Sequence, residues 1–245
     1  MLVGYEVERV HLARGDGRAL CGQVVTAVRS HGKQLFIDFA SGLTLRSHLG
    51  LYGSWHRYAH GEPWRKPQRQ AGIVLETADL CLVCFHPRQV AVESTAASTS
   101  RELMQRLGPD LTAANVDTAT CVHRARALLS AETPLLDVLL DQRVAAGIGN
   151  VYKSEVLFLC GLTPTRLLGD ISDAQVTDLY LKASELMRLN LGGGRRITRF
   201  VDDGRGGLWV YRRGDRPCFH CGCAIRMARL GRDRRSTYWC PVCQS

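Results

Sequence analysis

Four cysteines near the carboxyl end of this 245-residue sequence have the spacing of a tetrahedral metal site. They form two Cys-x-x-Cys pairs, Cys218 with Cys221 and Cys240 with Cys243, and eighteen residues separate the pairs. Thiolates arranged in this way on a short β-hairpin bind one Zn²⁺ ion. Bound zinc contributes on the order of 10–16 kcal/mol to the folding of such a small segment. We predict one structural zinc ion; a disulfide pair is the weaker alternative in a reducing compartment.

The other closely spaced cysteines do not extend this pattern. Cys223 follows Cys221 by two residues, which breaks the paired spacing, and we exclude it from the ligand set. Cys81 and Cys84 are also two residues apart, but they lie in the apolar run Leu80–Phe85 with no second pair nearby. Buried thiols behave as small hydrophobic groups. We therefore expect Cys81 and Cys84 to be core residues.

The positive charge is concentrated in one segment before and within the cysteine region. Residues 195–235 contain twelve arginines and no lysine, against four aspartates and no glutamate, in a chain whose net charge is +9. The rest of the chain is close to neutral. The guanidinium group of arginine can donate two hydrogen bonds to phosphate oxygens, and its binding releases counterions from the nucleic acid. The segment therefore favours a nucleic-acid partner. The alternative is a solvated basic face.

The elements that must position these residues divide the chain into three parts. From about Val24 to Glu93 the pattern is strand-like, which predicts an antiparallel sandwich or barrel. After the polar stretch Ser94–Ser100 the spacing of apolar residues becomes helical. The segment that contains the four cysteines, which we call the zinc ribbon, follows from about Gly206. We predict an α+β multidomain protein with a β-sandwich in residues 1–95, a helical domain in 96–205 and a zinc-ribbon finger in 206–245.

Within the helical part, residues 135–158 predict two helices joined by a glycine-rich turn. The first helix is expected to end near Val144 and the second to begin near Asn150. Gly147 and Gly149 allow the backbone to approach a phosphate, and Asn150 adds a side-chain donor at a helix N-terminus. An ordinary helical hairpin, with Asn150 as a plain cap, is the alternative.

Several of these segments resemble one protein family. Asp141–Asn150 looks like the helix–two-turn–helix motif of the formamidopyrimidine-DNA glycosylase and endonuclease VIII family, and Arg235–Gln244 resembles the end of its zinc finger. Ser47–Gly53 is similar to the family's wedge loop, and Gln105–Asp110 to its domain junction. The resemblance runs from about Val24 to the carboxyl end and favours the endonuclease VIII branch.

The resemblance implies a bifunctional DNA glycosylase and abasic-site lyase of base-excision repair, acting by β,δ-elimination. A damaged base must leave the stack before the enzyme can reach its bond to the sugar. The enzyme therefore needs residues that hold the DNA phosphates and side chains that fill the space left by the extruded base. By resemblance, Lys33 contacts phosphate and assists β-elimination, and Arg235 assists the second elimination. The implied catalytic residues are thus Lys33 and Arg235, and the implied DNA-binding residues are Lys33, Leu51, Tyr52, Arg106, Asn150 and Arg235.

The first residues differ from the family pattern. Family members begin Met-Pro-Glu, and the proline amine attacks the sugar C1′ as a nucleophile. This sequence begins Met1-Leu2-Val3-Gly4, so on this pattern we expect it to lack the Pro-Glu helix. One hypothesis is an active enzyme whose recorded start lies downstream of the true one. The alternative is a catalytically impaired protein that binds lesioned or abasic DNA.

A third hypothesis belongs to another functional class: a zinc-ribbon protein that binds RNA or a protein partner. It predicts clustered aromatic side chains for base stacking, and aromatic residues make up only 7% of this sequence without such a cluster. This composition argues against it.

Composition also bears on the location and partners of the protein. Hydrophobic residues make up 45% and charged residues 22%, and no apolar run approaches the roughly 18 residues of a membrane span. The first residues lack the pattern of a signal peptide. We expect a cytoplasmic, nucleoid-associated monomer without a membrane partner. Its expected partner is damaged DNA, either duplex or single-stranded.

Overall fold

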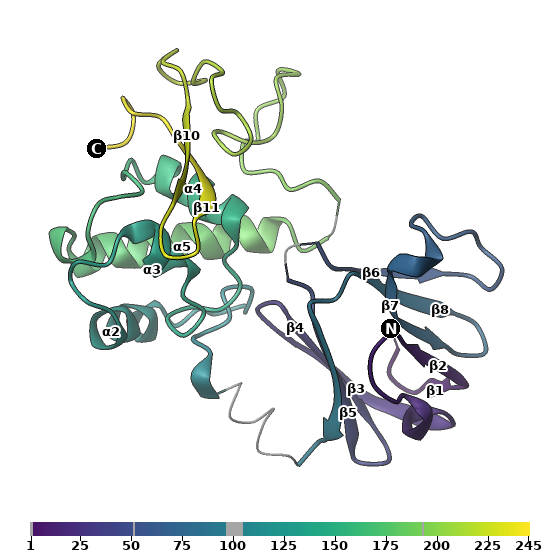
Figure 1. The fold of residues 1–245 in the computed structure, drawn as a ribbon. Coiled ribbons are helices and arrows are strands. Elements are labelled where there is room, and N and C mark those ends of the chain that lie inside the picture. Colours follow the sequence, from purple (N-terminus) through teal and green to yellow (C-terminus); the bar gives the residue numbers. More distant parts are fainter. Residues whose placement is uncertain (1, 51, 97–104, 193) are drawn as a thin grey trace. The chain divides into compact units, whose positions relative to one another are not determined.

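The computed structural model describes residues 2–50, 52–96, 105–192 and 194–245, coloured along the chain in Figure 1. The chain forms two compact units, Met1–Gln105 and Arg106–Ser245. The described residues of the first unit are rich in β-strands. Those of the second carry four helices of six or more residues, followed by a β-hairpin. No helix in the described ranges has the length and apolar content needed to cross a membrane.

Two antiparallel sheets build the first unit. The five-stranded sheet has the order β1-β3-β4-β5-β9 and the four-stranded sheet the order β2-β7-β8-β6. Short 3₁₀ turns occupy Arg18–Leu20 and Gln68–Gln70. The strands are β1 (Glu6–Val7), β2 (Arg9–Leu12), β3 (Gln23–His31), β4 (Gln34–Phe39), β5 (Leu43–His48), β6 (Ser54–Tyr58), β7 (Ala71–Glu76), β8 (Cys81–Phe85) and β9 (Gln89–Ser94).

Side-chain alternation decides which faces of the two sheets meet. Ile37 and Leu45 of the first sheet share a buried cluster with Ile73, Leu75 and Cys84 of the second. Successive residues of a strand point to opposite faces, so the intervening residues of β7 and β8 point away from this cluster. These outer residues form a second cluster with Trp64 packed against it, containing Tyr58, Ala71, Val74, Cys81, Val83 and Phe85. The predicted β-sheet domain is confirmed, and both cysteines of the apolar run are buried.

Helices α2 (Thr118–Leu128), α3 (Leu135–Leu140), α4 (Asn150–Leu159) and α5 (Asp173–Leu189) form the helical part of the second unit. Polar caps start two of them. Asp117 accepts a hydrogen bond from the backbone N–H of Thr120 at 2.8 Å, and Ser172 and Gln175 form a reciprocal capping box. Apolar residues of all four helices contribute to one buried cluster, with Cys121 and Ala125 supplied by α2 and leucines by the other three. A 3₁₀ turn at Leu168–Asp170 precedes α5.

The second unit ends in an antiparallel hairpin of β10 (Arg226–Leu230) and β11 (Arg235–Trp239). Strand β11 packs against α4, as the yellow hairpin beside the teal helix in Figure 1 shows. The compact unit that holds the helices therefore also holds the cysteine region. The division into three domains at residues 95 and 205 remains a prediction.

One predicted boundary is wrong. The helix expected to end near Val144 ends at Leu140, and Asp141 already has extended backbone angles. The Asp141 carboxylate accepts a hydrogen bond from the backbone N–H of Arg143 at 2.9 Å, and such a local bond competes with helix continuation. The second helix begins at Asn150 as predicted.

Candidate nucleic-acid interface and metal site

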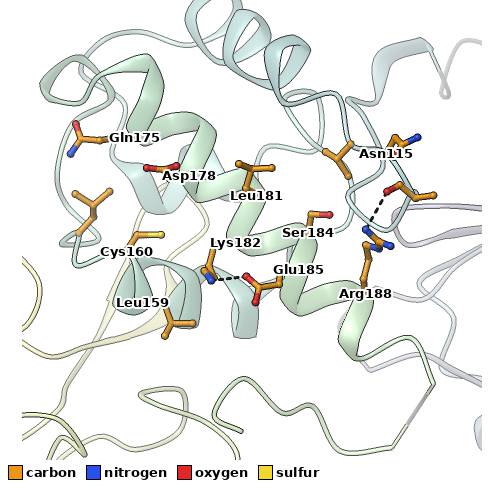
Figure 2. Close-up of a pocket in the computed structure, with 13 residues that line it drawn as sticks. Asn115, Leu159, Cys160, Gln175, Asp178, Leu181, Lys182, Ser184, Glu185 and Arg188 are labelled. Carbon is orange, nitrogen blue, oxygen red and sulfur yellow. Dashed lines mark hydrogen bonds and ion pairs between the residues drawn. The ribbon is translucent and has the colours of Figure 1, made fainter.

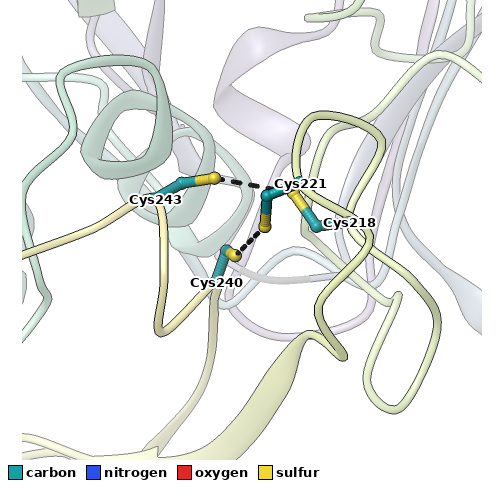
Figure 3. Close-up of side chains that lie close together, drawn as sticks. All are labelled: Cys218, Cys221, Cys240 and Cys243. Atoms are coloured by element: carbon teal, nitrogen blue, oxygen red, sulfur yellow. Dashed lines mark hydrogen bonds between the residues drawn. The ribbon is translucent and has the colours of Figure 1, made fainter.

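The four predicted cysteine ligands meet at one point. Their sulfur atoms all lie within 4.8 Å of one another, and Figure 3 shows them converging. The Cys218 and Cys243 sulfurs are 3.9 Å apart, and those of Cys221 and Cys240 are 3.4 Å apart. Tetrahedral Zn–S bonds of about 2.3 Å require sulfurs about 3.8 Å apart. The cluster can therefore hold a metal ion.

The excluded cysteine stays outside this cluster. The thiol of Cys223 contacts the carbonyl oxygen of Ala224 at 3.9 Å, and its sulfur is not part of the four-cysteine group. The imidazole Nδ1 of His220 lies 3.5 Å from the Cys243 sulfur, at the edge of the group.

Some of the arginines in the basic segment are structural. Arg199 and Arg213 are only 3% and 8% exposed, and their guanidinium carbons lie 4.3 and 3.3 Å from the ring centroid of Phe219. Arg199 also forms an ion pair with Asp203. Stacking on both guanidinium groups fixes Phe219 beside Cys218. The charge available for a phosphate backbone is therefore smaller than the arginine count indicates.

Asn150 is the first residue of α4, and it does not cap that helix. The cap position belongs to Gly149, which has extended backbone angles and no side-chain bond to the helix. The Asn150 amide nitrogen instead donates to the carbonyl oxygen of Ser236 at 2.8 Å and to its hydroxyl at 3.1 Å. The plain-cap alternative is wrong, because the side chain joins α4, and with it the preceding two-turn loop (residues 141–149), to strand β11.

The amide of Gln142 organises the loop before Asn150. Its nitrogen donates to the carbonyl oxygens of Leu140 and Ile148, each at 3.1 Å, and its oxygen accepts from the N–H of Gly147 at 2.9 Å. Gly147 has a φ of +115°, a value that L side chains rarely adopt. Gln142 is not among the residues predicted for the site, although it lies within the segment that carries the resemblance.

Arg124 connects the start of the second unit to the same loop. Its guanidinium donates to the carbonyl oxygens of Leu107 at 3.2 Å and Arg143 at 2.8 Å. Gly108 packs so closely on Val144 that an added Cβ would lie 2.2 Å from the Val144 oxygen. These contacts hold the backbone after Arg106, whose own side chain is exposed.

Arg235 begins strand β11. Its guanidinium lies 3.1 Å from the Asp233 carboxylate, and its side chain is 32% exposed. The preceding turn rests on α3, because the N–H of Arg232 donates to both Asp137 oxygens, at 3.1 and 3.2 Å. Gly231 fits there without a side chain, since a Cβ would lie 2.4 Å from the Asp137 oxygen.

Glu155 links α4 to the segment that enters the cysteine region. Its side chain is fully buried, and its carboxylate accepts hydrogen bonds from the Thr198 hydroxyl and from three successive backbone N–H groups. These groups are Trp209 N at 2.8 Å, Val210 N at 2.9 Å and Tyr211 N at 2.7 Å. The sequence analysis missed this residue, although a charge within the largely apolar run of α4 is a usable signal.

In the first unit, Lys33 lies in the turn between β3 and β4. Its carbonyl oxygen accepts from the N–H of Leu49 at 3.4 Å, which connects this turn to the predicted wedge loop. Burial lowers the pKa of His48, and the charges of Lys33 and Arg88 lower it further. Desolvation and neighbouring cations both disfavour a protonated imidazole. The Lys33 region therefore carries positive charge beside a neutral histidine.

The predicted wedge loop is held at both ends. Gly53 lies so close to Leu49 that an added Cβ would be 2.3 Å from the Leu49 oxygen. Tyr52 is 76% exposed, as a side chain that enters a duplex must be. Leu51 lies outside the described residues. A cavity of about 540 Å³ beside the loop is lined by Leu49, Tyr52, Lys66, Gln70, His86 and Arg88.

Comparison with known proteins identifies the family. The formamidopyrimidine-DNA glycosylase N-terminal domain matches residues 3–92, and the formamidopyrimidine-DNA glycosylase H2TH domain matches residues 107–202. A probable endonuclease 8 from Streptomyces coelicolor is 37% identical over 231 residues, covering 92% of this chain and 81% of the relative. The chain belongs to the formamidopyrimidine-DNA glycosylase/endonuclease VIII family.

A second relative and a solved structure of the same family are also similar to this chain. The DNA-(apurinic or apyrimidinic site) lyase Nei2 of Mycolicibacterium smegmatis is 38% identical over 228 residues, covering 92% of this chain and 84% of the relative. The Lactococcus lactis formamidopyrimidine-DNA glycosylase, solved with a lesion-containing DNA, has the same fold at a TM-score of 0.81 and 22% identity. That match covers 100% of this chain and 94% of the other.

These comparisons bear on two expectations: where the similarity begins, and whether the protein is catalytically impaired. The N-terminal domain matches from residue 3, so the expectation that similarity begins near Val24 is wrong. The strands β1 and β2, which precede Val24, belong to the two sheets of that domain. The relatives are named as glycosylases, endonucleases or lyases, and none supports the alternative of a catalytically impaired protein.

For this family member, the predicted DNA-binding residues fall in both units. The second unit brings Asn150 into contact with Ser236, next to Arg235 in strand β11. The turn that holds Lys33 and the loop that holds Tyr52 are joined within the first unit by the Lys33–Leu49 backbone bond.

A larger hollow on α5 contains none of the predicted site residues. It measures about 800 Å³, and Figure 2 shows its charged side chains along the helix. Lys182 pairs with Glu185 at 2.6 Å, and Arg188 donates to the Ala114 carbonyl oxygen at 3.1 Å. Because no residue predicted to bind DNA or metal lines this hollow, we do not assign it to the candidate site.

Proposed function

We propose that this protein is a bifunctional DNA glycosylase and abasic-site lyase of base-excision repair. The observation that carries the proposal is the contact between the two-turn loop and the finger strand through Asn150 and Ser236. It places a helix N-terminus beside the strand that carries Arg235, a combination suited to phosphate binding. Names of relatives at 37% and 38% identity support the same activity.

The proposed substrate is damaged DNA, in duplex or single-stranded form, bound by a monomer. Arg106, Asn150 and Arg235 would hold phosphates, and Leu51 with Tyr52 would fill the space left by an extruded base. A DNA substrate also agrees with the proposed cytoplasmic, nucleoid-associated location.

In the proposed reaction, an amine of the enzyme attacks C1′ of the damaged nucleotide and the base leaves. The C1′–O4′ bond then breaks, which opens the sugar ring and gives an iminium ion. The iminium ion acidifies the C2′ proton, and loss of this proton expels the 3′ phosphate; a second elimination expels the 5′ phosphate. Lys33 is proposed to contact the phosphate beside the lesion and to act as a proton donor during β-elimination. Arg235 is proposed to assist the second elimination.

We also propose that the four-cysteine cluster binds one structural zinc ion. Four thiolates without an open position match a structural site. Cys218, Cys221, Cys240 and Cys243 would hold the ion, which would fix the two ends of the finger together. Its contribution is folding energy, and the reaction itself belongs to the amine and the phosphate-binding residues.

Borohydride trapping on a duplex with one abasic site tests the proposed function. An imine-forming amine becomes covalently attached to the DNA after reduction, and peptide mass mapping identifies it. We expect a covalent adduct and cleavage of the unreduced substrate at the abasic site. DNA binding with neither an adduct nor cleavage would overturn the proposed lyase.

Replacement of Arg235 by alanine is expected to weaken binding to an abasic-site duplex and to leave the fold intact. Loss of one phosphate contact lowers the slope of log K against log salt by about 0.9. Fluorescence anisotropy across a salt series measures this slope. Arg188→Ala removes a charge from the α5 hollow and serves as the matched control, with an unchanged slope. An unchanged slope for Arg235→Ala would exclude Arg235 as a phosphate contact.

Replacement of Lys33 by alanine is expected to reduce strand cleavage at abasic sites by about 100-fold, since a positioned proton donor contributes roughly 10²–10⁴-fold. Single-turnover cleavage of a labelled duplex measures the effect. Lys182→Ala, which removes a lysine paired with Glu185 on α5, should cleave at the wild-type rate. A Lys33→Ala protein with normal cleavage would remove Lys33 from the mechanism.

A further inference from the structure

A buried lysine lies directly behind Asn150. Lys153 follows Asn150 by three residues on α4, so the two side chains share one face of the helix. The Lys153 side chain has no solvent exposure. Its ammonium group donates to the Asn150 amide oxygen at 2.8 Å, to the Thr237 hydroxyl at 2.7 Å and to the Ser236 carbonyl oxygen at 3.2 Å. These three acceptors match the three donors of an ammonium group.

The Lys153 ammonium decides which way the Asn150 amide faces. An ammonium group has no acceptor, so it must face the amide oxygen and cannot face the nitrogen. With the oxygen held, the nitrogen points to Ser236, where it makes bonds of 2.8 and 3.1 Å. The orientation of Asn150 therefore depends on a residue that has no access to a ligand in solvent.

Burying the charged group of a lysine between a helix and a strand costs desolvation free energy. Among the described residues, none of the hydrogen bonds of Lys153 goes to a carboxylate. The pKa of Lys153 is lowered to about 8, chiefly by burial and also by the charge of Arg235 on β11, while Asp137 on α3 opposes this shift. An apolar side chain of similar length would fill the same space without the cost of desolvation. The charge thus needs a role beyond packing.

We propose that Lys153 is a positioning residue for DNA binding, which orients the Asn150 amide and holds it against the strand that carries Arg235. The inference rests on the proposed function, in which Asn150 and Arg235 contact phosphates. For Asn150, a phosphate oxygen would replace the Ser236 hydroxyl, the more distant of the two acceptors of its amide nitrogen. Lys153 itself does not touch the DNA. It acts through Asn150, so its removal has an effect only while Asn150 is present.

A double-mutant cycle tests this dependence. Binding to a duplex with a tetrahydrofuran abasic-site analogue is measured for Lys153→Met, Asn150→Ala and the double variant. We expect each single change to weaken binding about tenfold and the double variant also about tenfold, whereas independent residues would give about 100-fold. Additive losses would overturn the inference.

Thr237→Val is the matched control for a purely structural role. It removes a second acceptor of Lys153 on β11 and leaves the Asn150–Lys153 bond in place. We expect a loss of binding below about threefold, since the bond that orients Asn150 remains. If Thr237→Val and Lys153→Met weakened binding equally, Lys153 would be only a connection between α4 and β11.

Metal content and thermal unfolding of each variant show whether the fold is retained. If Lys153→Met loses its metal or unfolds, Lys153→Arg tests the orientation instead, because arginine also has only donors and must face the Asn150 oxygen. We expect Lys153→Arg to bind within about threefold of wild type. A folded Lys153→Arg protein that keeps its metal and still loses binding about tenfold would overturn the inference.

The outcomes also separate this inference from the proposed function. If Asn150→Ala binds as tightly as the wild-type protein, the proposed phosphate contact fails and the role of Lys153 fails with it. If Asn150→Ala binds weakly while Lys153→Met binds normally, only the role of Lys153 is overturned.

Discussion

Replacement of Cys240 by alanine is expected to release the metal, unfold the finger and reduce DNA binding by more than about 100-fold. The remaining three sulfurs cannot complete a closed tetrahedral site, and the binding free energy of a structural zinc ion is folding free energy of about 10–16 kcal/mol. Cys240 is fully buried and packs with Phe158, Val210 and Ile225, so its loss also disturbs the base of the finger. Strand β11, which carries Arg235, begins five residues earlier.

Metal analysis, circular dichroism and anisotropy with an abasic-site duplex measure the three consequences of Cys240→Ala. Cys223→Ala is the matched control, because Cys223 lies in the same segment but outside the four-sulfur cluster. We expect the control to retain one zinc ion per chain and wild-type affinity. Undiminished DNA binding by Cys240→Ala would contradict the role of the finger.

Replacement of Glu155 by alanine is expected to lower the free energy of unfolding by at least about 3 kcal/mol, because each buried donor left without an acceptor costs about 1–3 kcal/mol. The Glu155 carboxylate accepts bonds from the Thr198 hydroxyl and from the N–H groups of Trp209, Val210 and Tyr211. These donors belong to the segment that leads into the finger. We also expect weaker DNA binding, since that segment loses its attachment to α4.

Urea unfolding followed by tryptophan fluorescence measures the stability of Glu155→Ala, and Trp209 reports on the affected segment. Glu155→Gln keeps the shape but turns one acceptor into a donor that faces N–H groups, so we expect a loss of similar size. Glu185→Ala is the matched control, because this exposed residue pairs only with Lys182 among the described side chains, and its removal should cost about 0.5 kcal/mol or less. Equal stabilities of the Glu155 and Glu185 variants would show that the buried bonds do not hold this segment.

The four-cysteine cluster was the most predictable part of the protein. A ligand set of two Cys-x-x-Cys pairs is local at each end, and the metal geometry restricts how the two ends meet. The sequence therefore predicted Cys218, Cys221, Cys240 and Cys243, and it correctly excluded Cys223. The start of α4 at Asn150 was predictable for a similar reason, because glycines before a helix and apolar spacing within it are local signals.

The alternative in which Asn150 is a plain cap failed because side-chain partners can be distant in the chain. Asn150 and Ser236 are separated by 86 residues, and their contact exists only because β11 packs on α4. The end of α3 at Leu140 was missed because Asp141 bonds to the backbone of Arg143, and apolar periodicity carries no information about such bonds.

The family, the β-rich and helical parts, the four clustered cysteines and the candidate residues of the site could be predicted from the sequence. These features depend on local spacing, on alternation or on motifs that are contiguous in the chain. Which polar residues of α4 are buried, and which groups they bind, depends on how the folded chain packs. Lys153 reaches Thr237 across 84 residues, and Glu155 reaches Tyr211 across 56, so their roles depend on chain packing that no local pattern encodes. A buried charge must find partners wherever the fold brings donors and acceptors together, and at α4 those partners come from the finger and the segment before it.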